Sequence, residues 1–266
     1  MRLSFPPLLA VALAAVTHAC QREEGEIVRE KPTTFAAAEE VKIGATLTDA
    51  DWSEAGVPLL VPGAEGYDPE AYDYLRPLVR GLTQQAGVTR RDSFAWDVLL
   101  VRDDETHAYT LPGGQIVLHT GLLHALANEA ECVGILAREI ALAEQGAAIA
   151  AYDRVVEDNV LLGDLLLGNA TELPRLVALT STVRYTPREL RAADSLAARL
   201  VCPSDYLHEG LLDAVRRIPG RSPYHKARPS QRGSAVRFAA RVRDCAGSDS
   251  TYAKRYRGLV QRAVAE

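Results

Sequence analysis

Histidine is the side chain best suited to bind a metal ion or transfer a proton near neutral pH, and His107, His119 and His124 lie close together in this sequence. A catalytic zinc ion takes three protein ligands and keeps one position open for water. Two histidines at positions i and i+4 of a helix would supply two of these ligands from one face. None of the three histidines has this spacing relative to another. We therefore expect each of them to be exposed or hydrogen-bonded rather than a metal ligand.

The cysteines indicate an oxidising compartment. Three of the four lie well beyond the N-terminus, at Cys132, Cys202 and Cys245. Cys132 falls in an apolar helical stretch and is expected to be a buried free thiol. Cys202 and Cys245 flank a basic region, and a disulfide between them would contribute about 4 kcal/mol through loop closure. The spacing alone leaves this pairing open, because sequence does not fix cysteine geometry.

Apolar spacing and turn residues predict the elements that position these side chains. Asn128 and Glu131 have the spacing of a capping box, and the helix that follows is expected to end at Gly146. Strands are predicted over 93–101 and 115–120. An order of helix, short strands and then mostly helices indicates an α+β fold with a small sheet. Further helices are predicted over 67–83, 152–167, 172–183, 188–201, 207–218, 235–245 and 251–265.

The first residues have the features of a signal peptide over 1–19. Residues 8–16 are apolar, but this run is too short to cross a bilayer as a helix. A lipobox interpretation makes Cys20 the lipid-carrying first residue of the mature protein, and ordinary cleavage without lipidation is the alternative. Residues 20–38 are polar and would form a tether. We expect an outer-membrane lipoprotein facing the periplasm, or a soluble periplasmic protein if Cys20 carries no lipid.

Charge is distributed unevenly along the chain. The formal net charge is -5, yet residues 216–266 hold 13 Lys and Arg against 3 acidic residues. This asymmetry predicts either an anionic partner such as a lipid headgroup, or packing of the basic segment on the acidic body of its own chain. We interpret residues 241–266 as a basic C-terminal helix. No nucleic-acid partner is expected for an exported acidic protein without aromatic residues interleaved among its basic ones.

A longer motif carries a resemblance to a known family. Residues 107–117 read His-Ala-Tyr-Thr-Leu-Pro-Gly-Gly-Gln-Ile-Val. They are similar to the Asn-Ala-Phe-Ala-Leu-Pro-Gly-Gly edge strand of the HtpX- and Oma-like gluzincin zinc peptidases, relatives of the prenyl-protein protease. Residues 121–123, 128–131 and 138–142 follow in the family's order. The resemblance spans about 39–240. It implies a mostly helical, zincin-like (minigluzincin) metallopeptidase domain with a small edge-exposed sheet, and zinc as the family's cofactor.

The resemblance also implies where this sequence departs from the family. It places the three zinc-ligand positions on Arg138, Leu142 and Leu190, and the general base on Glu139. Leucine has no donor atom, and arginine is permanently cationic and would repel the metal. Without zinc, water would not be acidified for attack on a peptide carbonyl. We therefore expect no cofactor, and a Glu139 carboxylate with no activated water to act on.

A fifth position suggests that an ion pair replaces the metal. Asp194 matches the family aspartate that orients the first zinc histidine. Because Arg138 stands where that histidine would be, we predict an Asp194–Arg138 ion pair that bridges two helices, with Glu139 able to share the guanidinium. The alternative is that Arg138 reaches solvent through the former cleft.

Peptide binding in such domains does not depend on the metal, because the substrate is held as an added strand at a sheet edge. We predict that this edge strand lies just after the turn of the motif, and a purely structural strand is the alternative. The predicted peptide-binding residues are Gly113, Gly114, Gln115, Ile116, Val117 and Leu118.

These observations predict a pseudoenzyme with a role related to proteolysis. It would bind extended or unfolded envelope polypeptides, act like a chaperone in envelope protein quality control, and reach the membrane through its lipid anchor. The first alternative is an active metalloendopeptidase of the same family with non-standard metal ligands. The second is a regulatory partner of an active peptidase paralogue.

Overall fold

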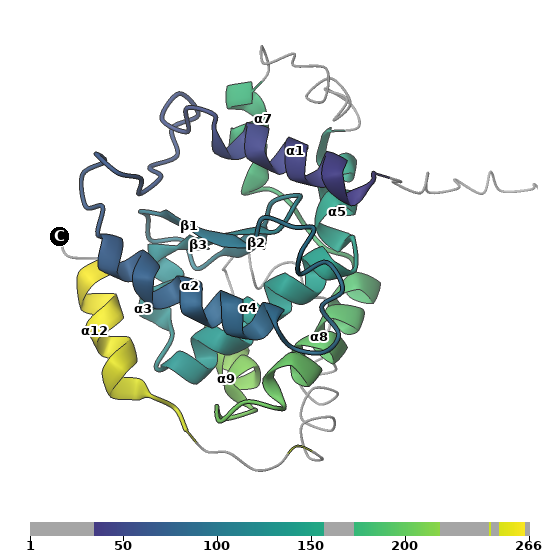
Figure 1. Ribbon diagram of the computed structural model, residues 1–266. Helices are drawn as coiled ribbons and strands as arrows, with labels where there is room; N and C mark the ends of the chain where they lie inside the picture. Colours follow the sequence, from purple (N-terminus) through teal and green to yellow (C-terminus); the bar gives the residue numbers. More distant parts are fainter. Residues whose placement is uncertain (1–34, 157–172, 219–244, 246–249, 264–266) are drawn as a thin grey trace, which may run out of the picture. The chain divides into compact units, whose positions relative to one another are not determined.

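The computed structural model describes residues 35–156, 173–218, Cys245 and 250–263 (Figure 1). The predicted signal peptide, the lipidation site Cys20 and most of the predicted tether lie outside the described residues. So does the predicted helix over 235–245, apart from Cys245. No helix in the described part of the chain is both long and apolar enough to cross a membrane.

Three short strands form one sheet: β1 (Asp97–Val101), β2 (Ala108–Thr110) and β3 (Gln115–His119). Their order is β1-β3-β2, with β3 parallel to β1 and antiparallel to β2. The strand predicted over 115–120 is confirmed, whereas β1 occupies only the second half of the range predicted for it. The small sheet within a mostly helical chain confirms the predicted α+β class.

The topology corrects the predicted peptide-binding edge. β3 has a strand on each side, so its backbone donors and acceptors are used within the sheet and are not open to a peptide. Gly113 has φ 81°, and the turn that it forms lets β2 and β3 pair; a Cβ there would lie 2.6 Å from the Val41 backbone of the neighbouring helix. The prediction of an edge strand is therefore wrong for Gln115, Ile116, Val117 and Leu118, and Gly113 and Gly114 lie in the turn that precedes β3.

The described helices account for more than half of the residues that the structure describes, and several match the predicted ranges closely. The chain enters helix at Ala37, and the helix predicted from 152 begins at Ala147; its described part ends at Val156. The described helices are α1 (Ala37–Thr48), α2 (Pro69–Thr83), α3 (Thr120–Ala125), α4 (Glu129–Glu144), α5 (Ala147–Val156), α7 (Leu173–Thr180), α8 (Pro187–Val201), α9 (Gly210–Arg217) and α12 (Ala253–Ala263) (Figure 1).

Helix α4 is the central helix of this fold. It begins as predicted, with the Asn128 side chain accepting a hydrogen bond from the Glu131 backbone N–H at 3.0 Å. Every residue from Glu129 to Ala143 is buried. Helix α9 approaches so closely that a Cβ at Gly134 would lie 2.4 Å from the Leu211 nitrogen. A helix that is buried on all sides must find a partner for each charged side chain that it carries.

Candidate functional site

The N-terminal end of α4 holds two buried carboxylates that fasten other helices to it. Glu129 accepts hydrogen bonds from the Tyr206 hydroxyl at 2.6 Å, from Arg255 Nε at 2.6 Å and from the Tyr74 hydroxyl. Glu131 accepts from Arg217 at 3.1 Å. These contacts join α2, α9 and α12 to the start of α4. The contacts of both carboxylates therefore support a structural role.

The middle of α4 carries the predicted ion pair. Arg138 Nε donates to Asp194 Oδ1 at 2.7 Å, and Arg138 Nη2 donates to the same oxygen. The side chains are only 3% and 5% exposed, so the alternative in which Arg138 reaches solvent is wrong. Both donors use one carboxylate oxygen; the other, Oδ2, has no hydrogen-bond partner among the described residues. The pair bridges α4 and α8, as predicted.

A buried ion pair of this kind holds two helices at a defined spacing more than it adds net stability. Removing two charges from water costs several kcal/mol per ion, and the mutual attraction of the charges roughly repays this cost. Loss of one partner alone leaves an uncompensated buried charge. Arg138 and Asp194 therefore depend on each other, and the spacing of α4 and α8 depends on both.

The two leucines assigned to the other zinc positions belong to the hydrophobic core. Leu142 is fully buried and Leu190 is 5% exposed, and both join the main cluster of buried apolar side chains. The three positions together thus present one ion-paired guanidinium and two hydrocarbon side chains. None of them offers a lone pair to a metal ion.

Glu139, assigned to the general base, is fully buried and lies against β2. The Thr110 hydroxyl is 3.2 Å from Glu139 Oε2 and also 3.2 Å from the Glu139 backbone oxygen. One hydroxyl has a single proton to donate, so the two acceptors compete for it. Sharing of the Arg138 guanidinium by Glu139 stays a prediction.

The histidines form a cluster that their sequence spacing did not reveal. His119 Nδ1 lies 2.8 Å from an Asp103 carboxylate oxygen, and the His107 and His119 ring centroids are 5.5 Å apart. Burial, together with smaller contributions from the nearby His119 and Arg184, lowers the pKa of His107 to about 3. His124 is exposed. The expectation that His119 is hydrogen-bonded and that His124 is exposed is confirmed. The antiparallel pairing of β2 with β3 brings His107 and His119 together.

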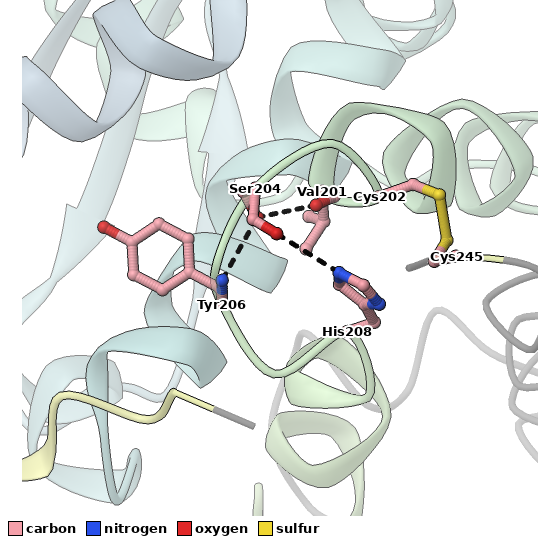
Figure 2. The surroundings of a disulfide bond; sticks show 6 residues. All are labelled: Val201, Cys202, Ser204, Tyr206, His208 and Cys245. Atoms are coloured by element: carbon pink, nitrogen blue, oxygen red, sulfur yellow. Dashed lines mark hydrogen bonds between the residues drawn. A yellow bond between two sulfur atoms is a disulfide. The ribbon is translucent and has the colours of Figure 1, made fainter. Parts of the chain in front are cut away.

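A disulfide secures the chain after α8 (Figure 2). Cys202, the C-cap of α8, is bonded to Cys245 across 43 residues of sequence. The Ser204 hydroxyl donates to the Val201 backbone oxygen at 2.6 Å, and a His208 ring nitrogen lies 3.4 Å from the Ser204 backbone oxygen (Figure 2). The structure therefore contains the Cys202–Cys245 disulfide, a pairing that the sequence alone left open. Cys132 is free and buried, as predicted, and burial raises the pKa of its thiol.

The edges of the sheet differ from each other. The outer edge of β1 is paired with the preceding segment: Leu60 N–H donates to the Leu100 oxygen at 2.8 Å, and Arg102 N–H donates to the Pro58 oxygen at 2.9 Å. On β2, the antiparallel register directs the Thr110 backbone away from β3. The Thr110 N–H instead lies 3.5 Å from the Tyr185 hydroxyl, which sits where an added strand would place a carbonyl oxygen.

The described helices and the three-stranded sheet form an α+β domain, and a family match identifies the class of protein to which it belongs. Residues 69–237 match Peptidase family M48 over more than half of the chain, and the chain belongs to this family. It is 24% identical over 171 residues to a beta-barrel assembly-enhancing protease of Yersinia pestis, covering 59% of this chain and 35% of the relative. The protein of that name from Escherichia coli (strain K12) is 22% identical over 175 residues, covering 61% and 35%. The chain therefore spans about a third of the length of these relatives.

The family match corrects the expectation that the chain has no cofactor, because M48 peptidases are zinc metallopeptidases. The residues at the three inferred ligand positions nevertheless do not fit zinc, since Arg138 is already committed to Asp194 and the leucines have no donor atoms. Within the described ranges, no group of three or more His, Cys, Asp or Glu side chains is placed to hold a metal ion. Zinc in this chain would have to take ligands other than Arg138, Leu142 and Leu190.

Proposed function

We propose that this M48 domain performs a peptidase-family role in the bacterial envelope by binding extended polypeptides rather than by cleaving them at α4. The observation that carries the proposal is the buried Arg138–Asp194 pair. Its guanidinium stands where the family resemblance places a zinc ligand, and a guanidinium has no lone pair to offer a metal ion. The Glu139 carboxylate lies within hydrogen-bond distance of the Thr110 hydroxyl, at 3.2 Å.

The outer edge of β2 is the binding surface for the extended polypeptide. Its Thr110 N–H points away from β3 and, among the described residues, meets the Tyr185 hydroxyl at 3.5 Å, a long contact and hence a weak one. All three β2 residues are buried, so a bound peptide would have to displace this side chain. A peptide that adds antiparallel to β2 would exchange this hydroxyl for a backbone carbonyl. Backbone hydrogen bonds of this kind give affinity with little dependence on peptide sequence, which suits a chaperone-like protein.

The comparisons and the cysteines support an envelope setting for this activity. The relatives are named for enhancing the assembly of β-barrels, and a polypeptide that has yet to form a barrel presents unpaired strand edges. The Cys202–Cys245 disulfide fits an oxidising compartment such as the periplasm. In this proposal the polypeptides come from envelope proteins, Cys20 provides a lipid anchor, and an active peptidase paralogue is a candidate partner.

A second candidate function is an active metalloendopeptidase that holds its metal with other ligands. One observation favours it: Glu139 retains the general-base position on α4, fully buried and adjacent to the β2 edge. The family cofactor is zinc, which agrees with this candidate.

The deciding experiment uses the purified full chain and its Glu139→Gln variant. Binding is measured by fluorescence anisotropy with a labelled, reduced and unfolded polypeptide, and cleavage is measured with casein in the presence and absence of a chelator. The proposal predicts that both proteins bind equally and that neither cleaves casein. Chelator-sensitive cleavage that Glu139→Gln abolishes would establish the second candidate instead. Absence of binding and of cleavage would reject both.

A further inference from the structure

A hollow on the surface, distant in sequence from α4, lies between the C-terminal half of α2 and the segment that leads into β1. Its cavity volume is about 330 Å³. Its walls combine three arginines with two aromatic rings and one acidic residue: Arg76, Arg80, Arg91, Phe94, Trp96 and Asp97. The three guanidinium groups and one carboxylate leave two positive charges, although the whole chain has a formal net charge of -5.

The three arginines of this hollow differ in how far their charges are neutralised. Arg76 forms two hydrogen bonds with the Asp97 carboxylate, at 2.8 and 3.1 Å, so its charge is matched. Arg91 is held by the backbone oxygens of Val88 at 3.3 Å and Gln84 at 3.5 Å, which fix its direction but carry no full negative charge. Arg80 is exposed and makes no ion pair with any described residue.

A simpler explanation for two of these charges is the C-terminal end of α2, where cations interact favourably with the free carbonyl groups. That explanation accounts for Arg80 and Arg91 near the helix end. It does not account for a cavity beside them or for its aromatic wall. The Trp96 indole is fixed in this wall, because its Nε1–H donates to the Arg90 backbone oxygen at 3.2 Å.

We infer that this pocket binds a phosphomonoester group. A phosphomonoester carries close to two negative charges near neutral pH, which matches the two guanidinium groups that no carboxylate neutralises. A carboxylate carries only one charge and would leave the second guanidinium unmatched. Arginine also presents its N–H groups in a fork that fits phosphate oxygens. The part of the ligand attached to the phosphate lies against the Phe94 and Trp96 rings.

The test measures binding of glycerol 3-phosphate to the full chain by calorimetry at constant ionic strength. Arg80→Gln removes a charged donor whose side chain makes no hydrogen bond or ion pair with a described residue, and the affinity is expected to fall about tenfold or more. Arg188→Gln, an exposed arginine on α8 with the same charge change, is the matched control and should bind like the parent. Arg91→Gln provides a second variant, with its fold checked by thermal melting because its guanidinium caps α2.

Vesicles distinguish a lipid headgroup from a soluble phosphoester. A Cys20→Ser chain, which cannot be lipidated, is sedimented with phosphatidylcholine vesicles containing equal fractions of phosphatidate or phosphatidylglycerol. Retention on phosphatidate that Arg80→Gln abolishes assigns the pocket to a lipid, and calorimetric binding without retention assigns it to a soluble ligand. Equal affinity of parent and Arg80→Gln for glycerol 3-phosphate would overturn the inference.

Discussion

Arg138 and Asp194 meet at 2.7 Å between two helices that are nearly sixty residues apart in sequence, and both charges are removed from solvent. In the zinc peptidases that the sequence resembles, the corresponding aspartate orients a metal-binding histidine. The resemblance places Arg138 and Asp194 at these two positions, and here the aspartate binds the guanidinium directly and joins α4 to α8.

The pair predicts a strongly non-additive effect on stability. Arg138→Ala should lower the free energy of unfolding by about 3–5 kcal/mol, because the Asp194 carboxylate would stay buried without its partner. Arg138→Met combined with Asp194→Leu should restore a stability close to that of the parent, since no buried charge remains. Urea unfolding of the single and double variants provides the measurement.

A partly exposed pair provides the control for this cycle. Arg154 and Glu189 join α5 to α8, and their side chains are 34% and 19% exposed. Arg154→Ala should cost only about 0–1 kcal/mol. If the double variant at Arg138 and Asp194 were as unstable as Arg138→Ala, the charges would not be the reason for the loss.

The ion pair could be predicted because the family resemblance placed both partners, with Arg138 at a zinc-histidine position and Asp194 at the position of the aspartate that orients that histidine. The capping residues Asn128 and Glu131 located the start of α4 independently of the resemblance. Such local helix signals are recorded well in a sequence, whereas the pairing of residues on two different helices came from the resemblance.

The peptide-binding edge was assigned incorrectly for a physical reason that the sequence also contains. Ile116, Val117 and Leu118 form an unbroken apolar run, which is typical of a strand buried on both faces rather than an edge strand. The actual edge strand, β2, has only three residues, too few to show a period. The His107–His119 contact depends on the pairing of these two strands, so no local spacing could reveal it.

Restoring the family's ligand set tests whether the inferred positions are those of the ancestral metal site. The combined variant Arg138→His, Leu142→His and Leu190→Glu should gain one equivalent of zinc relative to the parent after dialysis, measured by metal analysis. Asp194 is placed to orient the new imidazole, so adding Asp194→Ala should weaken zinc binding by about 10–100-fold. Equal zinc content in the combined variant and the parent would show that these positions were assigned incorrectly.

The Tyr185 contact predicts that peptide binding at β2 can be strengthened by a single atom change. Tyr185→Phe removes the hydroxyl that lies against the Thr110 N–H. A peptide would then no longer compete with it, and affinity should rise about 2–10-fold, the equivalent of one net hydrogen bond. The measurement is fluorescence anisotropy with the unfolded polypeptide used for the parent.

Tyr152→Phe is the matched control for that experiment, because it removes the hydroxyl of another buried tyrosine whose side chain interacts with Thr180. This variant should leave peptide affinity unchanged. Equal affinity of Tyr185→Phe and the parent would place the bound peptide away from Thr110.

His107 predicts how stability depends on pH. Its folded-state pKa is about 3, below the ordinary value of 6.5, mainly because burial disfavours the imidazolium. Between these two values the unfolded chain binds more protons than the folded chain does, so the free energy of unfolding falls as the pH decreases through this window. This single group contributes at most about 1.4 kcal/mol per pH unit.

Unfolding of the parent and of His107→Gln in urea at pH 6 and pH 4 isolates the effect of His107. The stability difference between the two proteins should shift by about 2 kcal/mol in favour of the variant at the lower pH. His124→Gln, at an exposed histidine, should keep the parent's dependence. An unchanged difference in the His107→Gln comparison would mean that His107 takes up its proton in the folded protein as easily as in the unfolded chain.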